Sequence, residues 1–342
     1  MSKLMSKTTL TTAVVPRLTS QLRPVATALL ITHSHYSSPV PVPILRLRPA
    51  ISVRSFHQSP PLYNNPSSSN NAHQQASTMT LPEFSLKDRV IVVSGGGRGV
   101  GLTQAEALLE AGAIVHALDL LPEPTADSEF TQIANKAASL GTCLTYHRVD
   151  VRDQPALNTI VAGIADKHGR MDGLIAAAGI QQETPALEYS REDSDKMLGV
   201  NVTGVFMTAQ AVARQMIRLK TKNGSMVLIG SMSGTVANRG LICPAYNASK
   251  AAVIQLARNL AAEWGEHGIR VNTLSPGYIV TAMTAGLFEA FPERKTDWPN
   301  ANMLGRLSYP HEYRGAAVFL LSDASSFMTG ADLRIDGGHC AW

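Results

Sequence analysis

The first 82 residues of the sequence lack acidic residues, and Glu83 is the first carboxylate of the chain. The same stretch carries seven basic residues, while the remaining 23 basic and 26 acidic residues leave the rest of the chain at −3. The positive charge of the whole chain therefore belongs to its leader, and it indicates no nucleic-acid-binding surface.

A leader that contains Arg, Ser and Thr but no acid has the composition of a mitochondrial transit peptide. Residues 54–59 (Arg-Ser-Phe-His-Gln-Ser) are similar to a matrix-protease cleavage region, and residues 60–82 are a low-complexity linker. We therefore expect residues 1–82 to be a transit peptide and linker, and the protein to reach the mitochondrial matrix. Initiation at Met79 would instead give a cytoplasmic form.

Long apolar runs and paired cysteines are also absent. The longest apolar run of the leader, residues 25–31, contains Thr27 and is too short to span a bilayer. The three cysteines, at positions 143, 243 and 340, form no even disulfide framework and have no metal-ligand spacing. These absences argue against a secreted scaffold, a membrane partner and a metal site.

The remaining residues, 83–342, alternate short β-branched runs with longer segments typical of helices, and they are numerous enough for one domain with a large core. The expected strands cover residues 89–93, 114–118, 143–149, 173–178, 226–229, 269–274 and 332–335. This order predicts an α/β fold of the Rossmann type: a doubly wound parallel sheet of about seven strands with helices on both faces.

A glycine-rich turn follows the first expected strand and precedes a helix. It reads Ser94-Gly95-Gly96-Gly97-Arg98-Gly99-Val100-Gly101. Glycines here let the backbone approach a pyrophosphate, and the helix N-terminus favours its negative charge. Because the turn lies between a strand and a helix, we assign it to cofactor binding through Gly95, Arg98, Gly99, Val100 and Gly101.

Asp119 ends the second expected strand, eighteen residues after Gly101. A carboxylate there can accept hydrogen bonds from both adenosine ribose hydroxyls and would repel a 2′-phosphate, so it favours NAD over NADP. Two alternatives stay open: Asp119 is only a turn residue, or Arg98 reaches a 2′-phosphate and NADP binds. Other residues at strand ends are also expected to face the cofactor, namely Asp150, Val151, Ala177 and Gly179.

Tyr246 and Lys250 lie four residues apart at the start of an alanine-rich apolar segment, so they share one face of a predicted buried helix. A free phenol titrates near pH ~10, and an adjacent ammonium should lower its pKa toward the working range. The pair is thus a candidate general acid/base. In isolation such a pair is more often a surface contact, so the assignment depends on its neighbours in the sequence.

Taken in order, these features resemble the short-chain dehydrogenase/reductase family over residues 86–338. The residues that match its motifs are Ser94, Gly95, Gly99 and Gly101 in the phosphate turn, Tyr246 and Lys250 in the Y-x-x-x-K element, and Pro276, Gly277, Ile279 and Thr281 in the proline-glycine element with its nicotinamide-binding Thr. One departure is Ala176-Ala177-Ala178-Gly179, where the family commonly has N-N-A-G, so bracing Asn side chains are missing.

The resemblance implies hydride transfer between a nicotinamide and a carbonyl or secondary alcohol. Tyr246 would exchange a proton with the substrate oxygen, and Ser231, with Ser233 as the alternative, would hydrogen-bond that oxygen. Lys250 would bind the nicotinamide ribose and lower the Tyr pKa, and Asn201 would hold a water that links Lys250 to solvent. The resemblance also suggests a homotetramer or homodimer.

Within the family, Ser231-Met232-Ser233-Gly234 and the ending, residues 336–342, resemble fungal polyol and ketose reductases of the arabinitol, mannitol and sorbose type. The expected substrate is a small polyol or ketose such as D-arabinitol or ribulose, covered by a lid at residues 282–306. Two alternatives remain: a mitochondrial 3-oxoacyl-carrier-protein reductase, and a nucleotide-bound scaffold without turnover. The presence of both Tyr246 and Lys250 argues against the scaffold.

Overall fold

The structure, a computed structural model, describes residues 81–342 apart from the side chains at positions 282, 283, 285 and 287. The predicted transit peptide and nearly all of the predicted linker lie outside the described residues. Within the described part, the helices are too short or too polar to cross a bilayer.

A sheet of seven parallel strands forms the centre of the fold, in the order β3-β2-β1-β4-β5-β6-β7. The strands are β1 (Val90–Ser94), β2 (Ile114–Asp119), β3 (Cys143–Arg148), β4 (Gly173–Ala176), β5 (Gly224–Ile229), β6 (Ile269–Pro276) and β7 (Asp332–Ile335). The strand order reverses between β1 and β4, and ligands bind at the carboxyl edge beside such a reversal. The predicted sheet is confirmed.

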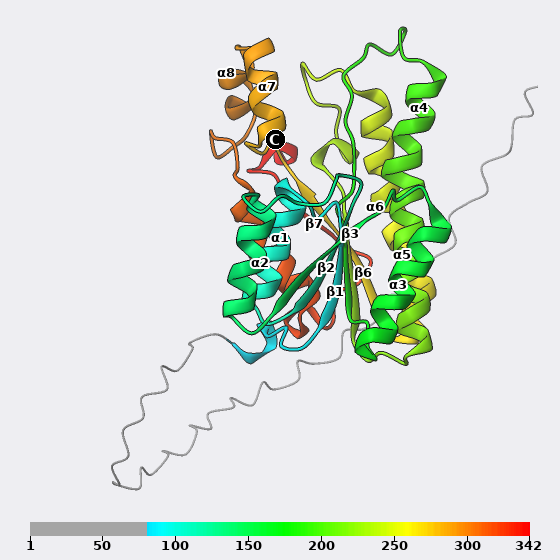
Figure 1. The fold of residues 1–342 in the computed structure, drawn as a ribbon. Helices are drawn as coiled ribbons and strands as arrows, with labels where there is room; N and C mark the ends of the chain where they lie inside the picture. The colour runs from blue at the N-terminus through cyan, green and yellow to red at the C-terminus, as the bar shows by residue number, and fades with distance from the viewer. Residues whose placement is uncertain (1–80) are drawn as a thin grey trace, which may run out of the picture. The chain divides into compact units, whose positions relative to one another are not determined.

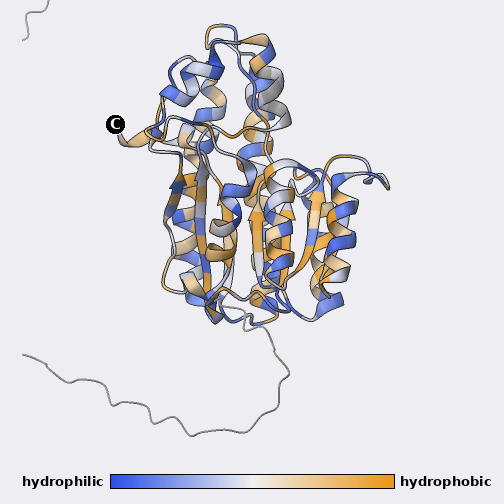
Figure 2. Cartoon of the chain, turned by 90° about the vertical axis from the view of Figure 1, so that its left-hand side faces the viewer, coloured by the Kyte–Doolittle hydropathy of each residue, from blue (hydrophilic) through white to orange (hydrophobic). Residues whose placement is uncertain are grey.

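Helices cover both faces of the sheet, as expected for a doubly wound fold (Figure 1). On one face lie α3 (Gln154–His168), α5 (Val205–Arg218) and α6 (Pro244–Trp264); on the other lie α1 (Gly99–Glu110), α2 (Glu129–Ser139) and α9 (Arg314–Leu321). Every residue of β1, β4 and β5 is buried, which explains why these strands are apolar runs without alternation. Figure 2 shows the central strands coloured mainly as hydrophobic.

The helical region that contains Asn201 is not regular. It consists of α4 (Arg191–Leu198), a π-helical segment η2 (Gly199–Gly204) and α5. Gly204 packs so closely on the loop after β3 that a Cβ there would lie 2.6 Å from Val151 Cγ2. Wide turns of this kind are frequent at functional sites, and Asn201 lies inside this one.

Two short helices, α7 (Ala282–Ala290) and α8 (Arg294–Asn300), lie beyond the carboxyl edge of the sheet, where the lid was predicted (Figure 1). The Trp298 ring stacks on Tyr278 with centroids 4.2 Å apart, and Trp342 donates a hydrogen bond to the Ala301 carbonyl at 2.9 Å. The end of the chain therefore packs against α8. Short 3₁₀ turns complete the fold: η1 (Pro82–Phe84), η3 (Met232–Gly234), η4 (Gly265–His267), η5 (Pro310–Tyr313), η6 (Asp323–Ser325) and η7 (His339–Ala341).

Candidate active site

The predicted acid/base residues lie together at the carboxyl edge of the sheet. Tyr246 and Lys250 are in the first two turns of α6, and the Lys250 Nζ lies 5.7 Å from the centroid of the Tyr246 ring. Ser231 follows β5 and is nearly buried, with 8% of its surface exposed. Its hydroxyl lies close enough to the Tyr246 hydroxyl to lower the pKa of that phenol, so the structure brings these three residues to one place.

The alternative hydroxyl, Ser233, is engaged elsewhere. Its Oγ donates to Asn238 Oδ1 at 2.7 Å, and its backbone N–H donates to Ser231 Oγ at 3.1 Å. This arrangement leaves Ser231 facing Tyr246 and favours it as the group that binds the substrate oxygen.

The pKa of Tyr246 differs from our expectation. Desolvation of its hydroxyl raises the pKa to about 12, and the hydrogen bond with Ser231 offsets this only in part. We expected Lys250 to lower this pKa. Instead, burial lowers the pKa of Lys250 itself to about 8, and its Nζ donates to the Ile229 carbonyl at 2.8 Å. An ammonium that turns toward a carbonyl and is itself less basic does little for the phenolate, so burial decides the balance.

Asn201 is completely buried, and its side chain braces the segment after β4. Its Oδ1 accepts from the Ile180 N–H at 2.8 Å, while Nδ2 donates to the Ile180 carbonyl at 2.9 Å and to Ser249 Oγ at 3.0 Å. The side chain thus ties this segment to α6 at Ser249, the residue before Lys250. The predicted role of Asn201 in holding a water stays a prediction.

The glycine-rich turn forms a cradle at the N-terminus of α1. Gly95 has a φ of +67°, and a Cβ there would lie 2.7 Å from the Ala178 backbone nitrogen. A Cβ on Gly101 would collide with the Gly95 carbonyl oxygen. Arg98 is the exposed N-cap residue of α1, and Gly99 and Val100 form its first turn. Backbone without side chains beside a helix N-terminus fits the pyrophosphate of a dinucleotide.

Asp119 lies directly beside this cradle. Its Oδ2 accepts from the Gly97 N–H at 2.9 Å, and its Oδ1 accepts from the Leu121 N–H at 3.2 Å. The carboxylate therefore fixes the turn, in agreement with the turn-residue alternative, and also lies where a ribose is expected. Sequence reasoning missed Arg148, an exposed residue at the end of β3 that lies opposite Asp119 of β2 in the parallel register.

The other predicted cofactor residues lie along the same edge. Asp150 accepts hydrogen bonds from Arg152, and these lower the pKa of its carboxyl; Val151 packs on Gly204. Gly179 is beside the acid/base pair, since a Cβ on it would lie 3.4 Å from Asn201 Oδ1 and 3.7 Å from Lys250 Nζ.

Backbone hydrogen bonds replace the missing Asn side chains after β4. The Ala177 N–H donates to the Ser94 carbonyl at 3.0 Å, and the Ala178 N–H lies 3.5 Å from Ser94 Oγ. After β6, Gly277 approaches Asp336, Ile279 bridges to Ser308, and the Thr281 N–H donates to Thr284 Oγ1 at 2.7 Å. Both segments follow strands at the carboxyl edge of the sheet, and their contacts with a cofactor stay a prediction.

The comparisons with known proteins agree with this geometry. A family model described as enoyl-(acyl carrier protein) reductase matches residues 95–339. The short chain dehydrogenase/reductase notP′ of Aspergillus versicolor is 45% identical over 76% of this chain and 89% of its own length. The chain belongs to the short-chain dehydrogenase/reductase family. It is an oxidoreductase of that family, and the family binds nicotinamide cofactors.

Other members of the short-chain dehydrogenase/reductase family are also similar to this chain over nearly their whole length. The D-arabinitol 2-dehydrogenase (ribulose-forming) of Candida tropicalis is 36% identical over 77% of this chain and 96% of that protein. The crystal structure of gox2181 superposes with a TM-score of 0.70 at 38% identity, over 76% of this chain and 98% of that one. The structure of a gluconate 5-dehydrogenase from Burkholderia cenocepacia, solved with NADP and tartrate, superposes with a TM-score of 0.68 at 32% identity. The match covers 76% of this chain and 98% of that one.

Sequence reasoning missed an ion pair that borders the site. Glu183, in the segment after β4, and Arg294, in α8, form two hydrogen bonds of 2.9 and 2.6 Å although 111 residues separate them. No local pattern could have found this pair, because neither residue lies in a motif and their contact depends on the complete fold.

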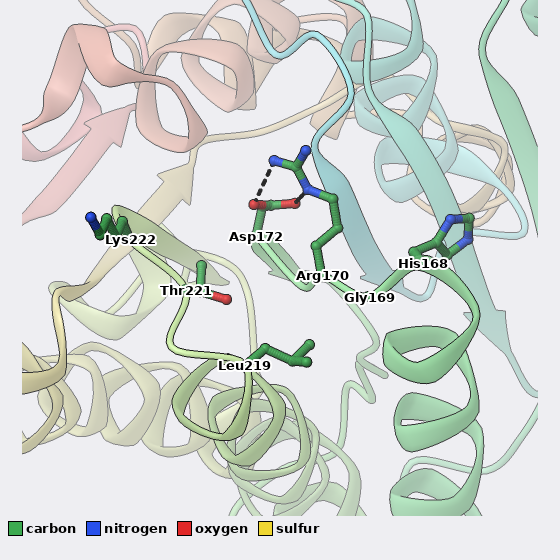
Figure 3. Close-up of a pocket in the computed structure, with 7 residues that line it drawn as sticks. All are labelled: His168, Gly169, Arg170, Asp172, Leu219, Thr221 and Lys222. Carbon is green, nitrogen blue, oxygen red and sulfur yellow. Dashed lines mark hydrogen bonds and ion pairs between the residues drawn. The ribbon is translucent and has the colours of Figure 1, made fainter.

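A groove of about 430 Å³ lies at the opposite end of the sheet, next to the start of β4 (Figure 3). Arg170 in this groove pairs with Asp172 at 2.7 Å, and Asp172 in turn accepts from the Val90 N–H at 2.7 Å. Its charges therefore hold strands together, and we assign it no chemistry. In the described part of the chain, no cluster of His, Cys, Asp and Glu has the arrangement of a metal site.

Proposed function

We propose that this protein is an NAD-linked dehydrogenase that interconverts a small polyol and its ketose, with D-arabinitol and ribulose as the first pair to test. The observation that carries the proposal is the meeting of Ser231, Tyr246 and Lys250 beside the dinucleotide cradle. The substrate class is supported by the similarity to D-arabinitol 2-dehydrogenases over nearly their whole length.

In this proposal the chain's own residues orient the alcohol and move its proton. Ser231 holds the substrate oxygen against Tyr246, whose hydroxyl exchanges the proton. Lys250 contacts the cofactor ribose, and the nicotinamide, when bound, accepts or returns the hydride. Because the proton must leave as the hydride departs, acid/base and cofactor have to be positioned in advance.

The preference for NAD is part of the proposal and is supported by the place of Asp119. Its carboxylate borders the glycine-rich turn, where it would repel a 2′-phosphate of about −1.5 to −2 charges. Two exposed cations are near Asp119 in the fold: Arg98 in the glycine-rich turn, and Arg148 opposite Asp119 in the register of β2 and β3. Because a cation could bind a 2′-phosphate, cofactor choice is tested directly below.

Location and assembly are proposed from the sequence and the family. The acid-free leader supports import into the mitochondrial matrix, with a cytoplasmic form from Met79 as the alternative. We also propose a homotetramer or homodimer that acts on a small molecule. A 3-oxoacyl-carrier-protein reductase is less well supported, since several of the curated relatives act on polyols or sugar acids.

The test is a substrate panel with protein that lacks the leader. We expect NADH formation with D-arabinitol and other pentitols or hexitols, and little reduction of a 3-oxoacyl thioester. Turnover of the thioester with no polyol oxidation would overturn the proposed substrate class and leave the family assignment in place.

A further inference from the structure

Two charged side chains near the catalytic residues, Glu183 and Arg294, form an ion pair with each other. Arg294 Nη1 and Nη2 each contact one oxygen of Glu183, in the two-pronged geometry that guanidinium and carboxylate prefer. Only 8% of the Arg294 side chain and 18% of the Glu183 side chain are exposed. A pair this deeply buried is held in a single arrangement, and its two charges cancel locally.

The pair lies against the substrate side of the crevice. The residue after Glu183, Thr184, donates its N–H to the Ile242 carbonyl at 3.1 Å, and Ile242 lies four residues before Tyr246. Burial, together with the nearby Glu183 carboxylate, raises the pKa of the Cys243 thiol to about 11. Glu183 is therefore a close neighbour of the N-terminal turn of the catalytic helix.

Arg294 is fixed from the lid side by aromatic rings. Its guanidinium carbon lies 4.0 Å from the Phe291 centroid and 5.2 Å from the Trp298 centroid. Trp298 stacks in turn on Tyr278, in the segment after β6. Tyr278 and Trp298 belong to one buried cluster with Met232, the residue after Ser231, so these contacts hold the guanidinium beside the catalytic residues. Without Glu183, a buried cation would be left unpaired there.

We propose that the Glu183–Arg294 pair makes the substrate pocket electrically neutral, so that it accepts uncharged polyols and rejects sugar acids. This inference rests on the proposed function and names the residues that set its substrate class. A carboxylate entering the pocket finds the guanidinium already engaged and meets the like charge of Glu183. In this proposal the specificity comes from a cation that is already occupied, which can be tested against the relatives named gluconate 5-dehydrogenases.

The matched ligands are D-gluconate and D-glucitol, which differ only in a carboxylate against a hydroxymethyl group. We expect the leaderless enzyme saturated with NADH to bind D-gluconate at least about tenfold more weakly than D-glucitol in calorimetry. In Glu183→Gln, which keeps the shape and removes the charge, D-gluconate binding should tighten at least about tenfold, because one charge-assisted hydrogen bond becomes available. D-glucitol binding should change much less.

Two further variants separate charge from structure. Glu183→Gln combined with Arg294→Gln removes both charges and should again bind D-gluconate as weakly as the wild type. Glu312→Gln disrupts another two-pronged pair, the exposed one with Arg306 at 2.8 and 2.6 Å, and should leave the ligand preference unchanged. Unfolding curves will show whether each variant is folded.

The inference is overturned if wild-type enzyme binds D-gluconate as well as D-glucitol, or if folded Glu183→Gln gains no D-gluconate affinity. If Glu183→Gln loses affinity for D-gluconate and D-glucitol equally, the pair only holds the lid. That result would also overturn the inference. The comparison of the two ligands on wild-type protein decides the matter even if Glu183→Gln does not fold. Failure of polyol turnover would instead reject the proposed function, since the binding measurements need no turnover.

Discussion

At the scale of single residues, the site depends on how burial and hydrogen bonds set the protonation of Tyr246. A phenol whose pKa is about 12 is protonated at neutral pH, so in the reduction of a carbonyl it can donate its proton directly. In the oxidation of an alcohol, the phenol must first lose its own proton before it can accept the proton of the alcohol. Ser231 is the group that offsets this burial, and Lys250 is directed to the Ile229 carbonyl.

Replacing Tyr246 by Phe removes the hydroxyl and keeps the ring. We expect the oxidation rate to fall by about a thousandfold or more, a loss typical of a missing acid/base group. NADH binding, followed by fluorescence, should persist because the glycine-rich turn and Asp119 are unaltered. Tyr309→Phe, at a site that is 50% exposed, is the matched control and should keep full activity. Substantial turnover by Tyr246→Phe would remove this residue from the mechanism.

Asp119 decides cofactor choice in our account. In Asp119→Ser the ratio of kcat/KM for NAD to that for NADP should fall by about tenfold or more, because the repulsion of a 2′-phosphate is lost. Asp127→Ser, an exposed carboxylate in the same connection between β2 and α2, should leave the ratio unchanged. A ratio that does not move in Asp119→Ser would make Asp119 a turn residue and would direct attention to Arg98 and Arg148.

At the scale of elements, the sequence was most informative where chemistry follows local pattern. Apolar β-branched runs predicted all seven strands, and the glycines between β1 and α1 predicted a turn whose backbone does approach Ala178. Features formed by distant segments could not be predicted. The π-helical segment depends on the contact of Gly204 with Val151, and the orientation of Lys250 depends on a carbonyl of β5.

A row of histidines between β2, β3 and α3 is another such feature. His116 is 1% exposed, and its two ring nitrogens lie 2.9 Å from His147 Nε2 and 2.9 Å from His168 Nε2. Burial, together with the charges of the two neighbouring histidines and of Lys167, lowers the pKa of His116 to about 3. His168 ends α3 before Gly169, and it also closes this row.

This row predicts a loss of stability in acid. The folded-state pKa of His116 is below the unfolded value of about 6.5, so the unfolded chain binds more protons and stability falls as pH drops from 6.5 toward 3. The slope should be up to about 1.4 kcal/mol per pH unit. In His116→Gln, chemical unfolding between pH 7 and about 5 should show a smaller slope. His267→Gln, at an exposed site, should show the wild-type slope, and equal slopes in all three proteins would contradict the account.

At the scale of the whole molecule, the chain combines a catalytic domain with a leader of opposite charge. A reporter fused to residues 1–82 should enter mitochondria and be trimmed near Phe56, because the leader is basic and free of acid. Microscopy and N-terminal sequencing of the reporter provide the measurement. A diffuse cytosolic reporter would favour initiation at Met79, and a fusion with Arg17, Arg23 and Arg54 changed to Gln is the control.

The central claim is that the assembled crevice moves a hydride directly from a polyol carbon to NAD. It is tested most directly with D-arabinitol that carries deuterium at C2, the carbon whose oxidation gives ribulose, followed by mass analysis of both products. Our account predicts that the deuterium appears in the reduced nicotinamide and that the sugar product is the 2-ketose ribulose. No reduction of NAD, or reduced nicotinamide without the label while D-arabinitol is consumed, would contradict it.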